Sequence, residues 1–260
     1  MSTRALQTGI NKDWSLHLSR LVVAVCIVAG WEALGQHGAD AWISRPGAIA
    51  ARLWMWSTTD LWMHLGTTLL EMLIGLVIGV PLGALSGLLL GRAPVINRLL
   101  RPIIVSVYNI PMIALAPLLI LWFGLDLMPK VVLVTIVTYF ILFFATFSGS
   151  ESIDPDLFAT LNLMGASRTE QFRKIVLPAS TAWIASAMRL ALPYALIDAT
   201  MGEMLAARQG LGFLLTNAIS EVDMTGVFAT LIILMAIGVA MVVLANRIDR
   251  ACSGWRAAAK

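Results

Sequence analysis

The stretch SIDPDLFATLNLMGASRTEQFRKIVLP, residues 152–178, is a polar interruption in a largely hydrophobic chain, and it predicts two short helices joined at a glycine. Asp154 followed by Pro155 is typical of a helix start, because the carboxylate can accept from free first-turn amides and proline has no amide there. The first helix is expected to run to Met164. Gly165 can then adopt the left-handed conformation that closes a helix. The stretch therefore predicts a helical hairpin.

The second arm of this hairpin begins with a capping box. Ser167 and Glu170 are three residues apart, so each side chain can bond the backbone amide of the other. We expect this arm to end at Pro178, since proline interrupts helical hydrogen bonding. Apolar side chains at helical spacing predict a ridge, flanked by Arg168, Arg173 and Lys174, that consists of Leu157, Leu161, Met164, Phe172, Ile175 and Val176. Such a ridge requires a partner.

The composition of the whole chain is that of a membrane protein. Of its 260 residues, 59% are hydrophobic and 13% are charged, and the mean hydropathy is +0.85. Soluble domains are about half apolar and about a quarter charged. Cys26 and Cys252 suggest neither a disulfide framework nor a metal site, and the three histidines, His17, His37 and His64, have no ligand-like spacing. We expect no metal site and read each histidine as a boundary residue.

Apolar runs separated by polar turns predict an all-α integral membrane protein with about six transmembrane helices. The spans are expected at residues 16–36, 65–90, 102–124, 131–150, 179–205 and 225–245. Residues 1–20 form the N-terminal segment, and residues 151–178 form the loop that carries the hairpin. We expect residues 1–260 to form one membrane domain.

The N-terminal run has two interpretations. Ala39-Asp40-Ala41 has the small-x-small form of a signal-peptide cleavage site. However, Trp31 and Glu32 lie where a signal peptide would be apolar or small, which favours a retained first span. The following segment, rich in tryptophan and helical in its apolar spacing after Pro46, predicts a helix on the outer membrane surface.

The second span carries glycines at intervals of four, at positions 75, 79, 83 and 87. This spacing leaves one helix face nearly bare, so another helix can approach closely. A packing face is the favoured interpretation, and a hinge that gates a solute is the alternative. Pro81 predicts a bend in the same span.

The third span contains Asn109, Pro111 and Pro117. Two prolines in one span free backbone carbonyls, which only protein or a water-lined cavity can satisfy at membrane depth. Residues 108–117, beginning with Tyr108, are therefore candidates for the wall of a translocation pathway. A kinked packing helix is the alternative.

The fifth span is the most polar. A charged side chain at the centre of a span costs about 2.5–3.5 kcal/mol, so such residues normally face protein or water. We expect Tyr194 and Asp198 to face the pathway, and Arg189 to have a structural role near the cytoplasmic end. Arg189 and Asp198 lie about half a turn out of phase, so a direct pair would require a rotation at Pro193. The pathway candidates are Tyr108, Asn109, Pro111, Tyr194, Asp198 and Glu203.

The hairpin resembles the signature loop of the membrane-spanning permease subunits of bacterial ABC importers. Gly165 is followed after nine residues by Ile175, Leu177 and Pro178, as in that signature, but residues 159–161 are Ala-Thr-Leu where the family has Glu-Ala-Ala. In the family this loop is a coupling helix that docks in a cleft of the ATPase; a helix lying on lipid headgroups is the alternative. The resemblance implies that coupling involves Ala159, Leu161, Met164, Gly165, Ala166, Ser167, Glu170, Phe172, Ile175, Leu177 and Pro178.

The resemblance covers the chain from about Trp31 to Asp249. Over this range the chain is similar to the nitrate, sulfonate, taurine and bicarbonate branch of these permeases. The resemblance rests on residues 62–68, on IALAPLLILWFGL at 113–125, on Arg189 in MRLAL, on Glu203 in GEML and on the turn Gly210-Leu211-Gly212. These motifs together indicate the branch and not the solute. The resemblance implies a type I importer permease fold.

The resemblance also implies partners. Two permease subunits, expected to be identical, enclose a path, two cytoplasmic ATPase subunits drive it, and an extracytoplasmic binding protein delivers the solute. The chain contains no G-x-x-x-x-G-K-[ST] and no Gly-Lys pair, so it cannot hold ATP phosphates with that loop. We therefore expect no cofactor and no catalytic residue here, with ATP and Mg²⁺ on the ATPase, membrane lipid around the spans and no nucleic acid.

The distribution of basic residues predicts the orientation. With six spans, thirteen of the eighteen Lys and Arg residues fall on the side of the hairpin and both termini, Arg45, Arg52, Lys130 and Arg208 fall on the other, and Arg189 lies within a span. The positive-inside rule places the hairpin and both termini in the cytoplasm. The resemblance implies that the membrane is the inner membrane of a bacterial cell.

Two other classes of protein compete with this interpretation. A secondary transporter would usually show inverted repeats and paired broken helices, and a membrane-embedded enzyme would need a cluster of His, Asp or Ser at catalytic spacing. Neither pattern is seen in the sequence. A small anionic solute is expected, and a vitamin precursor or an aromatic acid is the alternative.

Overall fold

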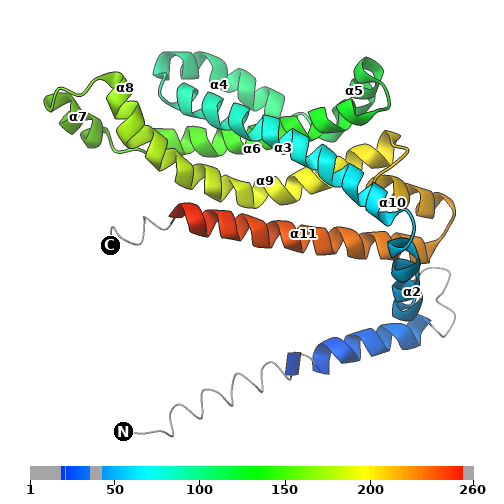
Figure 1. Cartoon of the computed structure of the whole chain (residues 1–260). Coiled ribbons are helices and arrows are strands. Elements are labelled where there is room, and N and C mark those ends of the chain that lie inside the picture. The colour runs from blue at the N-terminus through cyan, green and yellow to red at the C-terminus, as the bar shows by residue number, and fades with distance from the viewer. Residues whose placement is uncertain (1–18, 21, 36–42, 254–260) are drawn as a thin grey trace, which may run out of the picture.

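The computed structural model describes residues 19–20, 22–35 and 43–253, and this part of the chain is helical with no strand. After an apolar helix, Val22–Leu34, the elements are α2 (Pro46–Ser57), α3 (Leu61–Gly91), α4 (Pro94–Tyr108), the 3-10 helix η2 (Met112–Leu115), α5 (Ala116–Phe123), α6 (Leu127–Glu151), α7 (Pro155–Leu163), α8 (Arg168–Gln171), the π-helix η3 (Phe172–Val176), α9 (Leu177–Ala206), α10 (Leu211–Ser220) and α11 (Met224–Ser253). Figure 1 shows the long helices lying side by side.

The closest packing in the bundle is between α3 and α6. A Cβ atom added at Gly83 or Gly87 would lie 2.3 or 2.4 Å from a backbone oxygen of α6. At Gly79 it would lie 2.0 Å from the Thr138 hydroxyl. The bare glycine face predicted from the sequence is therefore a packing face, because no side chain fits between the two backbones.

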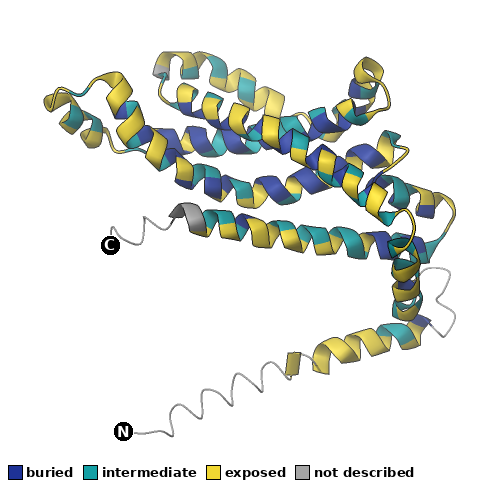
Figure 2. Ribbon diagram, in the orientation of Figure 1, coloured by how far each residue is buried: buried dark blue, intermediate teal, exposed yellow. Residues whose placement is uncertain are grey.

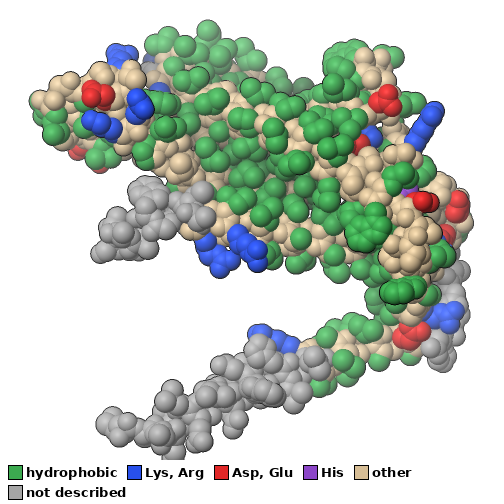
Figure 3. All heavy atoms as spheres, viewed as in Figure 1, with side chains coloured by type: hydrophobic (Ala, Val, Ile, Leu, Met, Phe, Trp, Pro, Cys, Tyr) green, Lys and Arg blue, Asp and Glu red, His purple; other side chains and the backbone are tan. Residues whose placement is uncertain are grey.

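Helix α9 lies at the centre of the bundle and contacts α3, α6, α10 and α11. Its alanines face the core, and Ala191, Ala195 and Ala199 are fully buried. Figure 2 shows buried residues gathered where the long helices meet, with exposed residues outside. The exposed surface along the helices is largely hydrophobic, as a membrane span requires, and charged side chains gather at the two ends of the bundle (Figure 3).

The two ends of the bundle are distinct. At one end lie α7 and α8, the turn between α3 and α4 and the last turns of α11 (Figure 1). We call this the hairpin end. At the other end lie the start of α3, the α5–α6 turn and the α9–α10 turn, and we call this the junction end.

The predicted third span is not one helix. Its two halves, α4 and η2 with α5, meet at an angle of 79° around residues 109–111. The described residues contain four helices that are long and apolar enough to span a membrane, or five if the bent pair counts as one. The bend occurs within the proline-containing stretch of the predicted span, because Pro111 begins a new helical segment in a different direction.

The predicted first span, 16–36, lies partly outside the described residues. Its described part is the apolar helix Val22–Leu34, whose C-terminal end packs through Trp31 on Phe228 of α11. The predicted helix after Pro46 is α2, which has this proline in its first turn. An ion pair between Arg52 and Asp223 attaches α2 to the start of α11.

Candidate functional site

The hairpin has the local geometry that its sequence predicts. The Asp154 carboxylate accepts from the amide of Asp156 at 2.9 Å and caps α7. Gly165 has a φ of +78° and ends this arm. Ser167 and Glu170 form the complete capping box at the start of α8. The caps predicted for both arms are confirmed.

The second arm does not end at Pro178. Helices α8, η3 and α9 follow one another without a break, so that 168–206 is one helical rod. Pro178 lies in the first turn of α9, immediately after the π-helical turn of residues 172–176. The predicted stop was wrong. Proline has no amide to donate to the preceding turn, but here that turn is the wider π turn, and the helix continues through Pro178. As a result, the second arm of the hairpin and the central helix α9 form one continuous helix.

Polar contacts hold the two arms together and attach them to the bundle. The side-chain amide of Gln171 donates to Asn162 Oδ1 at 2.5 Å and to the carbonyl of Ala166 at 3.2 Å. The Arg92 guanidinium, in the α3–α4 turn, lies 3.8 Å from the centroid of the Phe158 ring. Partial burial disfavours the charged form and lowers the pKa of Arg92.

The tip of the hairpin exposes large apolar side chains. Leu163 is 91% exposed, Met164 78% and Leu157 51%. Val176 is buried, so its predicted place on the exposed ridge was wrong: the π turn directs it toward the bundle. Leu163, absent from the predicted ridge, is the most exposed apolar residue of the tip because it lies at the last turn of α7.

The other predicted coupling residues lie along the same surface. The structure exposes Ala159, Gly165, Ser167, Glu170, Leu177 and Pro178. It partly buries Leu161, Ala166, Phe172 and Ile175. The hairpin therefore presents a mixed surface with its apolar part at the tip.

The predicted pathway residues fall into two groups. Tyr108 is half-exposed at the end of α4 and packs against Phe144 of α6 at 4.9 Å between ring centroids, and Asn109 and Pro111 form the exposed bend that follows. Tyr194 is half-exposed on α9, and Asp198, one turn later, is partly buried with Oδ2 lacking a hydrogen-bond partner. Both groups have surface from which a solute could approach, and their place on a pathway stays a prediction.

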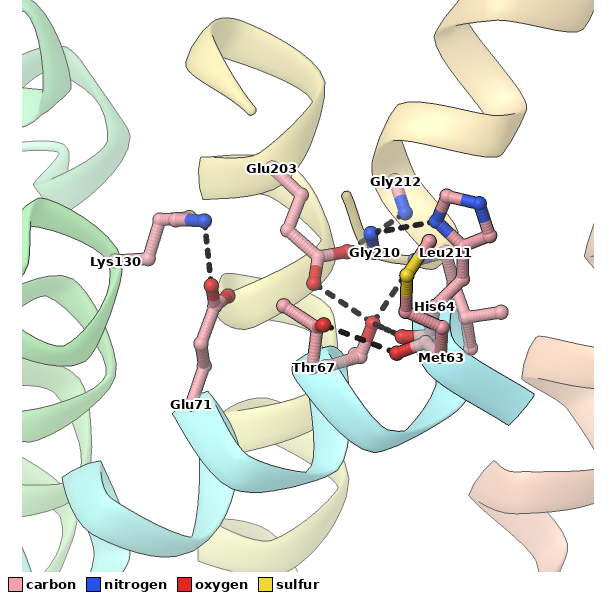
Figure 4. Close-up of polar contacts among 10 residues, drawn as sticks. Met63, His64, Thr67, Glu71, Lys130, Glu203, Gly210, Leu211 and Gly212 are labelled. Carbon is pink, nitrogen blue, oxygen red and sulfur yellow. Dashed lines mark hydrogen bonds and ion pairs between the residues drawn. The ribbon is translucent and has the colours of Figure 1, made fainter. Parts of the chain in front are cut away.

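Glu203 occupies a different environment from the other pathway candidates. It is 1% exposed, and its carboxylate accepts from the Thr68 hydroxyl and from the amide of Gly212, each at 2.7 Å. These contacts join α9 to α3 and to the start of α10 (Figure 4). In this structure Glu203 offers no surface to a solute, because the protein itself satisfies both oxygens. Its place on a pathway stays a prediction.

The α9–α10 turn is held by three consecutive amides. Those of Gly210, Leu211 and Gly212 donate respectively to His64 Nδ1 at 3.0 Å, Thr68 Oγ1 at 2.9 Å and Glu203 Oε2 at 2.7 Å. The first amides of a helix have no partner inside it, so these side chains supply the missing acceptors of α10. We call His64, Thr68, Glu203 and residues 210–212 the polar junction.

His64, predicted to be a boundary residue, lies in the first turn of α3 at the junction end. It is 6% exposed and stacks on Phe213 of α10 with ring centroids 5.8 Å apart. No sequence spacing indicates this role, because the partners of His64 lie 146 residues away. Within the described residues, no group of three His, Cys, Asp or Glu side chains could hold a metal ion.

A buried ion pair adjoins the polar junction, and the sequence reading missed it. Lys130 Nζ, at the start of α6, lies 2.5 Å from Glu71 Oε1 on α3, and both side chains are almost fully buried. Glu71 is the only acid of its apolar span, and an acid in such a span normally has a partner in the protein. The sequence therefore contained a signal for this ion pair. From the sequence, Lys130 was only counted among the basic residues on the side opposite the hairpin.

Arg189 has a structural contact near the hairpin end. It forms an ion pair with Asp249 in the last turns of α11. This pair joins the central helix to α11 and agrees with the packing role expected for Arg189. The contact with Asp198 considered from the sequence is not formed.

Residues 79–254 match the family described as binding-protein-dependent transport system inner membrane component. The chain belongs to this family. It is 32% identical to the formylaminopyrimidine transport permease protein ThiX of Halalkalibacterium halodurans, over 74% of this chain and 77% of the relative. It is 31% identical to the putative aliphatic sulfonates transport permease protein SsuC of Escherichia coli, over 95% of both chains. The protein is thus an ABC importer permease of the sulfonate branch.

Solved structures support the same fold. A chain of a bacterial ABC transporter involved in the import of the acidic polysaccharide alginate superposes with a TM-score of 0.66, at 16% identity, over 95% of this chain and 99% of that chain. The permease is a multi-pass membrane subunit with the type I importer fold, and its relatives are transport components rather than enzymes.

Proposed function

We propose that this permease imports a small anionic solute of the sulfonate, nitrate or taurine kind. The support for a sulfonate is the name of the SsuC relative, which matches over almost the full length of both chains. The name of the ThiX relative supports the alternative, a vitamin precursor or an aromatic acid. The binding protein that delivers the solute decides between them: the ligand that raises its melting temperature identifies the solute class.

The coupling step of this import occurs at the hairpin. The observation that carries this proposal is exposed apolar surface on the hairpin, from Leu163 and Met164 at its tip and Leu157 in the first turn of α7, on a frame held by helix caps. Exposed leucine and methionine at the end of a polar hairpin would be unfavourable in water. A cleft in an ATPase subunit would cover them.

The continuity of the second arm with α9 supplies a mechanical path. A displacement of the hairpin is carried directly into the rod of residues 168–206, on which Tyr194 and Asp198 lie. Two copies of the chain would present two hairpins to two ATPase subunits. Closure of the ATPase pair around ATP would draw the hairpins together and rock the bundle between inward-facing and outward-facing states, and hydrolysis would reset it.

In this proposal the hairpin end faces the cytoplasm. Arg92, Arg168, Arg173, Lys174 and Arg247 lie in the elements of this end, which agrees with the positive-inside rule. The junction end would then face the extracytoplasmic binding protein, and membrane lipid would surround the apolar bundle between the two ends.

The test of hairpin docking is the variant Leu163→Glu, with Thr169→Glu as the matched control. Both residues are exposed on the hairpin, but only Leu163 belongs to the apolar tip. Burying the new carboxylate at an apolar contact without a partner is strongly unfavourable. We expect Leu163→Glu to reduce copurification of the ATPase subunit by roughly tenfold or more, with normal amounts of permease in the membrane.

The outcome separates docking from a lipid-facing hairpin. If the hairpin lay on lipid headgroups, Leu163→Glu would release it from the membrane surface and leave ATPase copurification unchanged. Equal loss of the ATPase in the Thr169→Glu control would also contradict docking through the apolar tip. Labelling of the hairpin from outside the cell would overturn the orientation.

A further inference from the structure

The hairpin end contains a polar cleft of about 440 Å³ between the two arms of the hairpin and the α3–α4 turn. Its polar lining consists of Arg92, Asn162, Arg168 and Gln171, and Phe158 contributes an aromatic wall. The lining holds two guanidinium groups and no carboxylate. Pockets that bind small molecules commonly enclose about 300–1,000 Å³. The cleft is therefore large enough for a small anionic group, and its charge favours one.

The two arginines of the cleft have no anionic partner within the chain. Neither Arg92 nor Arg168 forms an ion pair among the described residues. Arg92 donates a long hydrogen bond of 3.4 Å to the carbonyl of Ser150, and a guanidinium has five N–H groups, so most of its donors remain available. Partial burial lowers the pKa of Arg92, and no nearby carboxylate opposes this effect. An anion in the cleft would stabilise this partly desolvated cation.

A third donor comes from the first arm of the hairpin. The Asn162 side-chain oxygen accepts from Gln171, which orients the Asn162 amide. Its side-chain nitrogen has no acceptor in the part of the chain that the structure describes, so this group is free to donate. Guanidinium and amide N–H groups are typical donors to phosphate oxygens, and arginine can make two parallel bonds to one phosphate. The cleft therefore has the donors that a phosphate group requires.

The cleft lies at the depth of a membrane surface. Helix α3 is an apolar span of 31 residues, which corresponds to a length of about 46 Å. A bilayer with both headgroup regions is about 40–45 Å thick. The end of α3 at Gly91 therefore lies at headgroup level, directly before Arg92. In the first turns of α4, Val95 and Leu99 are 81% and 71% exposed, as is typical of side chains that contact acyl chains.

We propose that this cleft binds the phosphate group of an anionic phospholipid from the leaflet at the hairpin end. Arg92 and Arg168 bind the phosphate oxygens, and Asn162 donates from the first arm. The acyl chains lie along the exposed apolar side chains of α4. A lipid already held at this depth loses less translational freedom on binding than a soluble phosphate compound does, which favours the lipid. The bound headgroup contacts the α3–α4 turn and both arms, so it stabilises the hairpin against the bundle.

The phospholipid site and the apolar tip lie on different faces of α7. With 3.6 residues per turn, Phe158 and Asn162 are about 40° apart around the helix axis, whereas Leu163 and Met164 are about 120–140° from Phe158. A phospholipid in the cleft and a partner protein at the tip can therefore be bound at the same time. The site does not depend on the proposed function.

The test compares two phospholipids with the same acyl chains, dioleoyl phosphatidylglycerol and dioleoyl phosphatidylcholine. Each lipid is titrated into the purified full-length permease in detergent, and native mass spectrometry counts the lipids that remain bound. We expect one saturable site for phosphatidylglycerol, with an affinity roughly tenfold higher than that for phosphatidylcholine, because the choline ammonium is repelled by the two arginines.

Variants assign the site to the cleft. Arg92→Gln and Arg168→Gln are each expected to reduce the preference for phosphatidylglycerol roughly fivefold. Arg173→Gln is the matched control, because Arg173 is an exposed arginine of the same arm outside the cleft lining, and it is expected to leave the preference unchanged. Arg168 is exposed at the start of α8, so its variant keeps the test decisive if Arg92→Gln fails to fold.

Other results would overturn the phospholipid site. Equal affinity for the two lipids, or a preference that neither variant reduces, would mean that the cleft holds no headgroup. Binding of glycerol 3-phosphate as tight as that of phosphatidylglycerol would mean that a soluble phosphate compound is the ligand. Loss of ATPase copurification in Arg168→Gln, with lipid binding unchanged, would mean that the cleft receives an acidic side chain of the ATPase. The lipid titration contains no ATPase, so failure of hairpin docking and failure of this site are separate results.

Discussion

The hairpin and the polar junction both cap the start of a helix, but they take their capping groups from very different distances along the chain. At α8 the acceptors come from Ser167 and Glu170, within one turn. At α10 they include His64 and Thr68, which lie 146 and 143 residues from their donors. The caps of the hairpin therefore need no other part of the chain, whereas the junction exists only when α3, α9 and α10 are assembled. The hairpin caps are local interactions, and the polar junction is a set of hydrogen bonds between helices.

The largest effect is expected from Glu203→Ala, which breaks the junction. This variant removes both acceptors, leaves the buried Gly212 amide without a partner, and leaves the Thr68 hydroxyl only the carbonyl of His64 to donate to. With about 1–3 kcal/mol for the unsatisfied amide and about 2 kcal/mol for the cavity left by the side chain, the loss of stability is expected to be about 3–5 kcal/mol. Thermal unfolding in detergent measures it. A loss of stability below about 1 kcal/mol would show that water replaces the carboxylate and that the hydrogen bonds of Glu203 contribute little to stability.

A smaller effect is expected from Gly210→Ala, with Gly165→Ala as its counterpart in the hairpin. Both glycines have positive φ, +117° and +78° respectively. A Cβ at Gly210 would lie 2.1 Å from the Glu203 carboxylate, whereas one at Gly165 would meet nothing within 4 Å. We expect a loss of about 2–3 kcal/mol at Gly210 and of about 1 kcal/mol at Gly165, where only backbone strain acts. Equal losses in unfolding measurements would mean that Glu203 simply moves away.

The smallest effect is expected from Ser167→Ala, which removes one half of the capping box. Loss of an N-cap hydroxyl typically costs about 1 kcal/mol, and here it acts on a short exposed arm. We expect faster hydrogen exchange over residues 168–171 and little change in the melting temperature of the bundle. A large drop in melting temperature would contradict the view that the hairpin is local, and would mean that its caps stabilise α9.

The sequence predicted correctly the interactions between residues close in the chain and the helix face that is marked by a regular repeat of glycines. The caps at Asp154 and Ser167 follow from neighbouring residues, and the glycine face of α3 follows from a four-residue repeat. The prediction failed at Pro178, where a π turn precedes the proline and the helix continues. At Pro111 the sequence left a kink open but gave neither its angle nor its direction. Proline removes one backbone hydrogen bond, but it does not determine whether the helix continues, bends or ends there.

The amino-acid sequence by itself determined that the chain is a helical membrane protein, that its polar hairpin is a capped structure, and that it resembles ABC importer permeases. Composition, periodicity and neighbouring capping groups are properties of a single segment, so they can be read without a fold. Only the tertiary structure decided that Glu203 and His64 are buried together in the polar junction, and that Lys130 pairs with Glu71. A buried polar group is defined by partners from other helices, and the packing of those helices is what brings the partners within reach.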